Sequence, residues 1–321
     1  MITRRRVIAG GLALPAVIRP SRAASRRITV LIGYHAGSFP DGQARACLPF
    51  MFRHLQLADM TVRNIHGGAG LAAMQALAEA PPSGATIGWI TTPTLPARMV
   101  DRDDATLLKR LTLLGAIVHE PVAFCSPAAA PLESAQDLIQ RVEQDADAHV
   151  LATPPPGSPA HLTALRFQRA AQAPLNIVPF PSAEAARQAV LAGNAAAAAL
   201  PLPHAVADIQ ANQLTGFGLS PHSQSGAPPE MVALDDAGIR LCGSIRRGIA
   251  TPAGFPDDLA ASLAGAMQAV TNDEGFQAHA ASGGFRAAWI AGPGWTDQVE
   301  RERTDLAQLW QSDPWLPSSG G

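Results

Sequence analysis

The order of apolar and polar positions along the chain predicts alternating strands and helices. Short apolar runs bounded by turn residues predict strands, and apolar positions at helical spacing predict the helices between them. The predicted strands are 28–32, 60–64 and 86–91, and the predicted helices are 41–57, which Pro49 is expected to kink, and 71–80. Strand, crossover helix and strand in this order are typical of a largely parallel sheet with helices on both faces.

A second series of the same kind follows an apolar stretch at 113–126, which we expect to cross between two lobes. This series has predicted helices at 132–145, 160–171 and 183–192, and predicted strands at 150–152, 176–180, 195–200 and 216–219. A return strand is predicted at 247–250, before helices at about 256–271 and 295–311. The sequence contains no internal repeat and no sustained heptad, which excludes a solenoid and a coiled coil.

The N-terminus has the pattern of an export signal, residues 1–23. A positive segment, Ile2–Arg6, precedes the apolar segment Val7–Ile18, which is too short to span a bilayer, and we expect cleavage before Ala24. The string TRRRVIAGG resembles a twin-arginine signal, although a general secretory signal fits nearly as well. We therefore expect a periplasmic protein without a transmembrane helix or a lipid anchor; a buried N-terminal helix is the alternative.

Composition indicates a globular protein of two domains. The 321 residues are 47% hydrophobic and 16% charged, and beyond residue 23 acidic side chains outnumber basic ones by seven. Such an acidic chain is a poor partner for nucleic acid, so we expect none. The three cysteines, Cys47, Cys125 and Cys242, fit no zinc spacing. Their odd number leaves at least one thiol free, and either three buried thiols or one disulfide is compatible with the sequence.

Three turns share one design, a loop of small residues directly after a predicted strand and directly before a predicted helix. They are residues 34–41, 67–70 and 156–161, and Thr91 and Thr92 end a further strand with two hydroxyls. Ligands of open α/β sheets bind at the carboxyl ends of strands, where helix N-termini offer unpaired N–H groups to carboxylates and phosphates. The turns are therefore candidate contacts for an anionic ligand, although each taken alone is compatible with ordinary turn chemistry.

The sequence lacks the common catalytic motifs. It contains no GxSxG, no HExxH and no GxxxxGK[ST], and the glycines at 67–70 do not complete a dinucleotide fingerprint. His35, His66 and His161 lie in the candidate turns, but no carboxylate or cysteine stands at metal-like spacing from them. We therefore expect neither catalysis nor a cofactor or metal.

The order of several motifs resembles the Bug-type periplasmic receptors, the TctC-like component of tripartite tricarboxylate transporters. The family's P-F-P-P-G-G-G-T-D turn falls on 33–41, its A-R-x-L-A-P helix on 44–49 and its N-R-P-G-A-G-G-N segment on 64–71. Its P-D-G-Y-T-L segment falls on 82–87 and its G-T-S segment on 90–92. Its G-T-S-S-H-L segment falls on 157–162, V-P-Y on 178–180 and L-A-P-A-G on 249–254. Together they cover nearly all of the chain after the predicted signal.

The resemblance implies a type II periplasmic-binding-protein fold, an α/β fold with two Rossmann-like lobes and a hinged ligand cleft. It also implies a carboxylated ligand that is bound partly by backbone amides of the first and third turns, and membrane transporter subunits as partners of a monomer. Carried over to this chain, those turns give Gly37, Ser38, Gly157 and Ser158, with Thr91 and Thr92 between them.

Several positions depart from the family's pattern where it binds its ligand. Phe39 and Pro40 replace a glycine and a threonine, and Leu200 replaces an acid. Arg246 and Arg247 stand where members carry the W-F of a W-F-G segment near the hinge. The loss of an acid and the gain of two cations would favour a more anionic or differently shaped ligand; the alternative is that both arginines face solvent.

We therefore predict lobe 1 over 24–120 and 246–321, with lobe 2 over 121–245. The predicted ligand contacts are Tyr34, Gly37, Ser38, Phe39, Asp41, His66, Gly67, Gly68, Thr91, Thr92, Gly157, Ser158, His161 and Arg246. The expected function is capture of a small carboxylated solute between the lobes and its delivery to a tripartite tricarboxylate-type transporter. A periplasmic ligand-sensing protein for a membrane sensor, and a periplasmic enzyme, are the alternatives.

Overall fold

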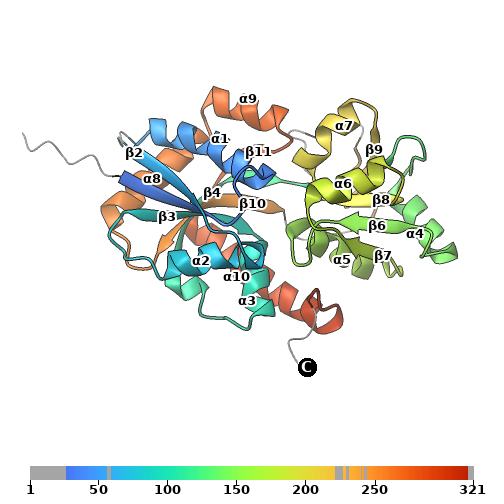
Figure 1. Ribbon diagram of the computed structural model, residues 1–321, viewed down its shortest axis with the longest axis horizontal. Helices are drawn as coiled ribbons and strands as arrows, with labels where there is room; N and C mark the ends of the chain where they lie inside the picture. The colour runs from blue at the N-terminus through green and yellow to red at the C-terminus, as the bar shows by residue number, and fades with distance from the viewer. Residues whose placement is uncertain are drawn as a thin grey trace, which may run out of the picture.

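The computed structural model describes residues 27–55, 59–220, 227–228, 231–239, 241 and 244–316. The predicted export signal and Cys242 lie outside these residues. Two α/β lobes lie side by side, each built around one sheet that carries helices on both faces (Figure 1). The predicted α/β class with two lobes is confirmed.

Lobe 1 contains a six-stranded sheet in the order β11-β4-β10-β3-β1-β2. Its first segment comprises β1 (Arg27–Ile32), α1 (Phe39–Arg53), β2 (Asp59–Asn64), η1 (Gly68–Gly70), α2 (Leu71–Ala78), β3 (Thr86–Thr92), α3 (Thr94–Asp101), η2 (Leu108–Arg110) and β4 (Leu111–Glu120). After lobe 2 the chain returns with β10 (Ile245–Pro252), α8 (Asp257–Val270), α9 (Glu274–Ser282), β11 (Arg286–Ala291) and α10 (Gly292–Ser312).

Lobe 2 contains a five-stranded sheet in the order β7-β6-β8-β5-β9. Its elements are β5 (Val122–Pro127), α4 (Ala135–Gln144), β6 (Val150–Thr153), α5 (Pro159–Ala171), β7 (Asn176–Pro179), α6 (Ala183–Leu191), β8 (Ala197–Pro201), η3 (Leu202–His204), α7 (Val206–Gln210) and β9 (Leu214–Ser220). The alanine-rich strand β8 is fully buried, because helices cover both faces of the sheet at that position.

The two sheets share one topology. Each has three parallel strands, β2-β1-β3 and β7-β6-β8, beside an antiparallel strand that arrives directly from the other lobe. That strand is β10 in lobe 1, between β3 and β4, and β5 in lobe 2, between β8 and β9. The chain therefore crosses between the lobes at Pro121 and again between β9 and β10.

Four helices or strands lie where none was predicted, namely α3, α7, α9 and β11, and the stretch predicted to cross between the lobes, 113–126, contains strands β4 and β5. Pro93 and Pro96 made the α3 segment resemble a loop, but Pro96 lies in the first turn, where a helical N–H has no partner in any case. Strand β11 is an alanine-containing edge strand that pairs only with β4. Helix α1 begins at Phe39 and ends at Arg53, with Pro49 inside it, so the predicted helix was too long at its C-terminal end.

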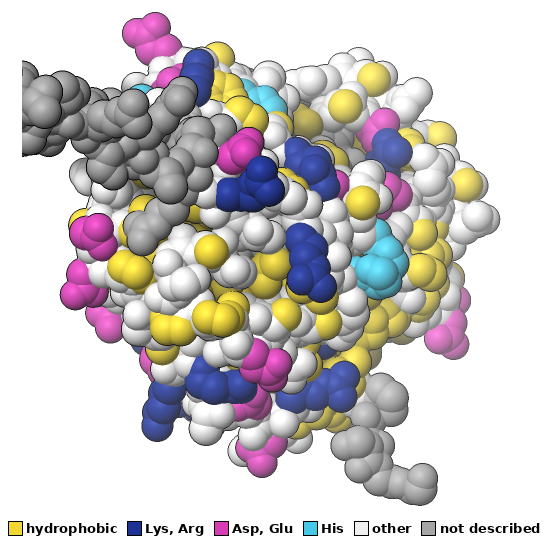
Figure 2. Space-filling model, turned by 60° about the vertical axis from the view of Figure 1, so that its left-hand side comes forward, with side chains coloured by type: hydrophobic (Ala, Val, Ile, Leu, Met, Phe, Trp, Pro, Cys, Tyr) yellow, Lys and Arg dark blue, Asp and Glu magenta, His cyan; other side chains and the backbone are white. Residues whose placement is uncertain are grey.

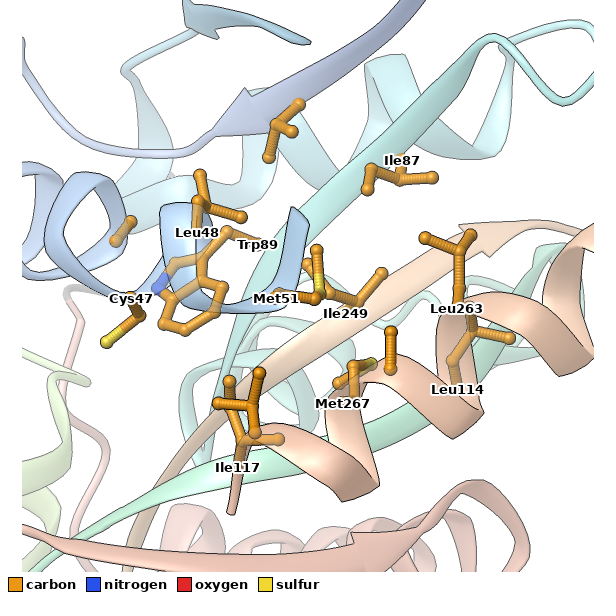
Figure 3. Packing of buried hydrophobic residues seen from close by; sticks show 14 of the residues in the cluster. Cys47, Leu48, Met51, Ile87, Trp89, Leu114, Ile117, Ile249, Leu263 and Met267 are labelled. Atoms are coloured by element: carbon orange, nitrogen blue, oxygen red, sulfur yellow. The ribbon is translucent and has the colours of Figure 1, made fainter. Parts of the chain in front are cut away.

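The core of lobe 1 lies between its sheet and the helices α1 and α8. Figure 3 shows Leu48 and Met51 of α1 opposite Leu263 and Met267 of α8, with Trp89 of β3 between the layers. All five side chains are at most 2% exposed, which buries a continuous apolar layer and fixes α1 on the sheet. The position of the turn before α1 follows from this packing.

Helix α10 belongs to lobe 1 but also packs against lobe 2. Leu306 and Leu309 of α10 and Trp315 share a buried cluster with Leu162 and Leu165 of α5. In Figure 1 α10 accordingly extends below both lobes. Polar contacts reinforce this junction: Nη2 of Arg166 on α5 lies 2.6 Å from Oδ2 of Asp305 on α10. The junction lies close to the returning strand, since Arg246 of β10 forms an ion pair with Glu302 of α10 at 2.8 Å.

A buried ion pair joins the two crossing segments. Arg247 of β10 donates from Nε and Nη2 to the two carboxylate oxygens of Glu120, the last residue of β4, at 3.1 and 2.9 Å. Both side chains are at most 3% exposed, and Gln43 of α1 also donates to Glu120. Arg247 reaches β3 as well, where its Nη1 donates to Thr91 at 3.3 Å. The pKa of Arg247 is raised, because the attraction of Glu120 outweighs the opposing effect of burial.

Cys47 and Cys125 are free, buried thiols. Burial raises the pKa of Cys125 to about 12, so this thiol stays protonated and behaves as a small apolar side chain. Among the described residues, no helix combines the length and apolar character that crossing a bilayer requires.

Replacing Glu120 by Gln should lower the free energy of unfolding by about 3–5 kcal/mol, because it leaves the Arg247 charge buried without its partner. Asp59→Asn is the matched control, since it breaks the Arg27–Asp59 pair, whose side chains are 71% and 56% exposed. The control should change stability by about 1 kcal/mol at most. Urea denaturation measures both variants, and equal effects would contradict the structural role of the buried pair.

Candidate ligand-binding cleft

A cavity of about 390 Å³ lies between the two lobes. This volume is in the range of small-molecule sites. Loops that follow β1, β2 and β3 line it from lobe 1, and loops that follow β6, β7 and β8 line it from lobe 2. The carboxyl ends of the parallel strands of both sheets therefore meet at this cavity, as expected for ligand sites of open α/β sheets.

Five of the predicted contacts line the cavity. They are Tyr34, Ser38, His66, Gly67 and Ser158. Gly37, Phe39, Asp41, Gly68, Gly157 and His161 belong to the same turns but are not among its lining residues. Thr91 lies beneath Tyr34, whose hydroxyl donates to Thr91 Oγ1 at 3.1 Å. The cavity therefore contacts part of each of the three predicted turns.

Two predicted contacts point elsewhere. Thr92 is fully buried and its Oγ1 accepts a hydrogen bond from Trp295 Nε1 at 3.1 Å. Arg246 forms an ion pair with Glu302 of α10 at 2.8 Å, while the next residue, Arg247, lines the cavity. Consecutive residues of a strand face opposite sides, which is why only one of the two arginines reaches the cleft. Neither arginine is exposed, so the alternative that both face solvent is wrong.

The first and third turns are two copies of one structure, one in each lobe. Gly37 and Gly157 have φ values of 79° and 71°, in the left-handed region that glycine favours. Ser38 and Ser158 follow as helix N-caps with nearly identical dihedrals, −69° and 159° against −71° and 158°. In both turns the glycine N–H points to the side chain four residues on, Asp41 Oδ2 at 2.9 Å or His161 Nδ1 at 3.4 Å.

These two N-caps leave their helix ends open. Among the described helices, Ser134, Ser182 and Asp273 accept the usual side-chain hydrogen bond from a first-turn N–H, but Ser38 and Ser158 do not. The hydroxyl of Ser158 is buried without a partner. The unpaired N–H groups and the partial positive charge at the starts of α1 and α5 therefore remain available to an anion.

The first turn is held by a buried carboxylate. Asp41 accepts hydrogen bonds from Gly37 N, from Arg45 Nε at 2.8 Å and from Asn64 Nδ2 at 2.8 Å. Burial opposes ionisation of Asp41, but these hydrogen bonds outweigh it and hold its pKa below the usual value. Asn64 Nδ2 also donates to the carbonyl of Tyr34 at 2.9 Å, so one network positions both ends of the turn.

Lobe 1 supports the third turn from outside the cavity. A Cβ added to Gly157 would lie 1.9 Å from Nη2 of Arg98 and 2.9 Å from Cδ1 of Trp315. Arg98 is 2% exposed and forms an ion pair with Asp101, which accepts a hydrogen bond from Trp315 Nε1 at 2.8 Å. The turn thus fits closely against α3 and the segment after α10.

Aromatic rings contact one another beside the cavity, which His35, His66 and His204 line. Phe39 of lobe 1 packs against His204 of lobe 2 with ring centroids 4.1 Å apart. His35 and His66 stack at 3.9 Å on the lobe 1 side. His204 Nδ1 lies 3.4 Å from Oε1 of Glu184, and the hydrogen bond from His204 is the main reason that the pKa of Glu184 is lowered to about 2. Glu184 therefore carries a negative charge at the cleft.

Sequence reasoning missed several lining residues. Glu184 and Thr94 stand in the first turns of α6 and α3, and His204 ends η3. No motif marks any of the three, and only their position in the fold brings them to the cleft. Pro154 and Pro155, just before the third predicted turn, also line the cavity. Thr94 is 3% exposed and its hydroxyl has no partner. The described residues hold no group of three or more His, Cys, Asp or Glu that could bind a metal.

The charged surface shows no basic stripe on the face drawn in Figure 2. Lys and Arg side chains are interspersed there with Asp and Glu and with apolar side chains.

Comparisons with known proteins agree with this geometry. The model of the tripartite tricarboxylate transporter family receptor matches residues 53–291. The structure is similar to the periplasmic binding protein BugD (20% identity, TM-score 0.74, covering 89% of this chain and 97% of that one). It is similar to a Rhodopseudomonas palustris protein with adipate (18% identity, TM-score 0.78, covering 90% of this chain and 98% of that one). It is also similar to MatC from the same organism with bound malate (20% identity, TM-score 0.73, covering 88% of this chain and 98% of that one). No curated protein matches the chain. These similarities show the predicted two-lobed periplasmic-binding-protein fold.

Gly157→Ala should damage the third turn far more than Gly193→Ala does. Both glycines have positive φ, 71° and 72°, so each alanine is strained by about 1–2 kcal/mol. Only at Gly157 does the new Cβ also collide with neighbours, since nothing lies within 4 Å of it at Gly193. Chemical denaturation should show a further loss of about 1–3 kcal/mol for Gly157→Ala. Equal losses for the two variants would refute the close fit against Arg98.

Acid should weaken the fold partly through His161. Burial lowers the pKa of His161 from 6.5 to about 4, so between these values the unfolded chain binds a proton that the folded chain does not. The contribution is complete above pH 6.5 and is lost as the pH falls to about 4, by roughly 3 kcal/mol. His161→Asn keeps an acceptor for Gly157 N and should flatten the pH dependence of unfolding by that amount. Parallel profiles for both proteins from pH 8 to pH 4 would contradict this.

Proposed function

The chain belongs to the tripartite tricarboxylate transporter receptor family. From this membership and from the uncapped starts of α1 and α5 at the cleft, we propose that the protein captures a small carboxylated solute in the periplasm. We propose that it then delivers this solute to a membrane transporter. The family is one of solute-binding receptors, so the proposed role is binding without chemistry. We further propose that the protein acts as a monomer and meets the transporter subunits with its outer surface.

The observation that carries this proposal is the pair of matching turns. The starts of α1 and α5 face one cavity from opposite lobes, and neither Ser38 nor Ser158 caps its own helix. A carboxylate between them would accept N–H groups from both lobes at once. Because such a ligand binds the closed arrangement better than an open one, it would shift the hinge toward closure.

Two unpartnered hydroxyls support the same location. Ser158 and Thr94 are both lining residues of the cavity, and their hydroxyls are buried without a hydrogen-bond partner. A buried hydroxyl without a partner is costly, and a carboxylate oxygen would satisfy either one. Thr94 precedes Arg98 by one helical turn, and Arg98 lies against Gly157, so the two hydroxyls lie near the same end of the cavity.

Isothermal titration calorimetry with a panel of mono-, di- and tricarboxylates tests the proposal, and we expect binding of at least one class. Ser158→Ala should weaken that binding about tenfold without loss of stability, since the hydroxyl caps nothing in the free protein. Ser134→Ala is the matched control: its hydroxyl caps α4, so it should cost about 1 kcal/mol of stability and leave affinity unchanged. A folded protein that binds no member of the panel would refute the proposal.

A further inference from the structure

The fixed charges of the cleft are unusual for a site that would hold two carboxylates. Among the described lining residues, Arg247 is the one arginine or lysine, and both of its carboxylate-facing nitrogens are taken by Glu120. The pair is buried and close to neutral as a unit, so it offers no free positive charge to a ligand. The expectation that added arginines make the ligand more anionic therefore fails on this geometry.

The remaining fixed charge at the cleft is negative. Glu184 lines the cavity from the first turn of α6, and its side chain is 49% exposed. Its contact is with His204, on its own lobe, and Ser182 beside it is occupied as the cap of α6 through Ala185 N at 3.1 Å. A ligand carboxylate placed here would meet a like charge and no available hydroxyl.

Much of the cavity lining is proline, including Pro40 and Pro159 in the first turns of α1 and α5. Six prolines line the cavity, namely Pro40, Pro154, Pro155, Pro159, Pro181 and Pro201. A proline has no backbone N–H, so this wall can contact a hydrocarbon but cannot donate to a carboxylate. Burying a second carboxylate against it would cost free energy without compensation. Unpartnered hydroxyls, by contrast, are found beside the start of α5, on Ser158 and Thr94.

We propose that the cleft selects a monocarboxylate with an apolar body over a dicarboxylate of the same length, and that Glu184 is the residue that rejects the second carboxylate. This inference rests on the proposed function, because it takes the first carboxylate to bind between the starts of α1 and α5. Discrimination arises from a repulsive charge as well as from a fitting wall, which is a common way to obtain specificity.

Calorimetric titration with two matched pairs of probes tests the inference: hexanoate against adipate, and benzoate against terephthalate. We expect the monocarboxylate of at least one pair to bind at least about tenfold more tightly than its partner. Glu184→Gln keeps the size of the side chain and an acceptor for His204. It should strengthen dicarboxylate binding about tenfold at low salt, change monocarboxylate binding less than about threefold, and lose its effect as salt screens the half-exposed charge.

Glu274→Gln is the matched control, since Glu274 is also an acid in the first turn of a helix, α9, but does not line the cavity. It should leave all four affinities unchanged. Dicarboxylates that bind the wild type as tightly as their monocarboxylate partners would overturn the inference and leave the proposed function standing. An unchanged preference in Glu184→Gln would overturn the role of Glu184. If neither pair binds a folded protein, the carboxylate function and this inference both fail.

Discussion

The buried ion pair between Arg247 and Glu120 fixes, within the lobe 1 sheet, the two strands through which the chain leaves this lobe and returns to it. Glu120 ends the strand that leaves lobe 1 and Arg247 lies in the strand that returns to it, so one contact ties both crossings together. Arg247 extends this contact to Thr91 and thereby to Tyr34 at the cleft, and Glu120 extends it to Gln43 of α1. The positive charge of Arg247, which would otherwise be free at the cavity, is thus paired with Glu120 and stabilises the strands around it. The proposed carboxylate would then have to be bound by other groups.

The groups available for this are the backbone N–H groups at the starts of two helices, α1 in lobe 1 and α5 in lobe 2. Because both lobes have the same strand order, the same Gly-Ser turn occurs at the same place in each, and the two turns face each other across the cleft. Ser38 and Ser158 stand at N-cap positions but accept no hydrogen bond from a first-turn N–H, so those N–H groups stay available at the cleft. Among the five described helices whose N-cap is a serine or an aspartate, the other three, which begin after Ser134, Ser182 and Asp273, do have a side-chain cap.

Much of the fold could be predicted from the sequence, because β-rich runs, glycine turns and helix starts are local features. The pattern placed most strands and helices of both lobes, and it identified the turns around Gly37 and Gly157. It did not identify α3, whose prolines suggest a loop until their position in the first turn is known. It also could not choose between Arg246 and Arg247, since that choice depends on the pairing of β10 with β3 and β4. Glu184 reaches the cleft only through the packing of lobe 2, for which no local signal exists.

The packing of α10 across both lobes has a mechanical consequence. The apolar cluster around Leu306 and Trp315 and the Phe39–His204 contact join the same two lobes at separate places. A rigid rotation that keeps the cluster packed must have its axis close to α10, and displacement then grows with distance from that axis. Under such a rotation the lobes would move least beside Gly157, which packs against Trp315, and more at the Phe39–His204 contact. The proposed carboxylate site beside the start of α5 would thus lie near the rotation axis, and the Phe39–His204 contact would lie far from it.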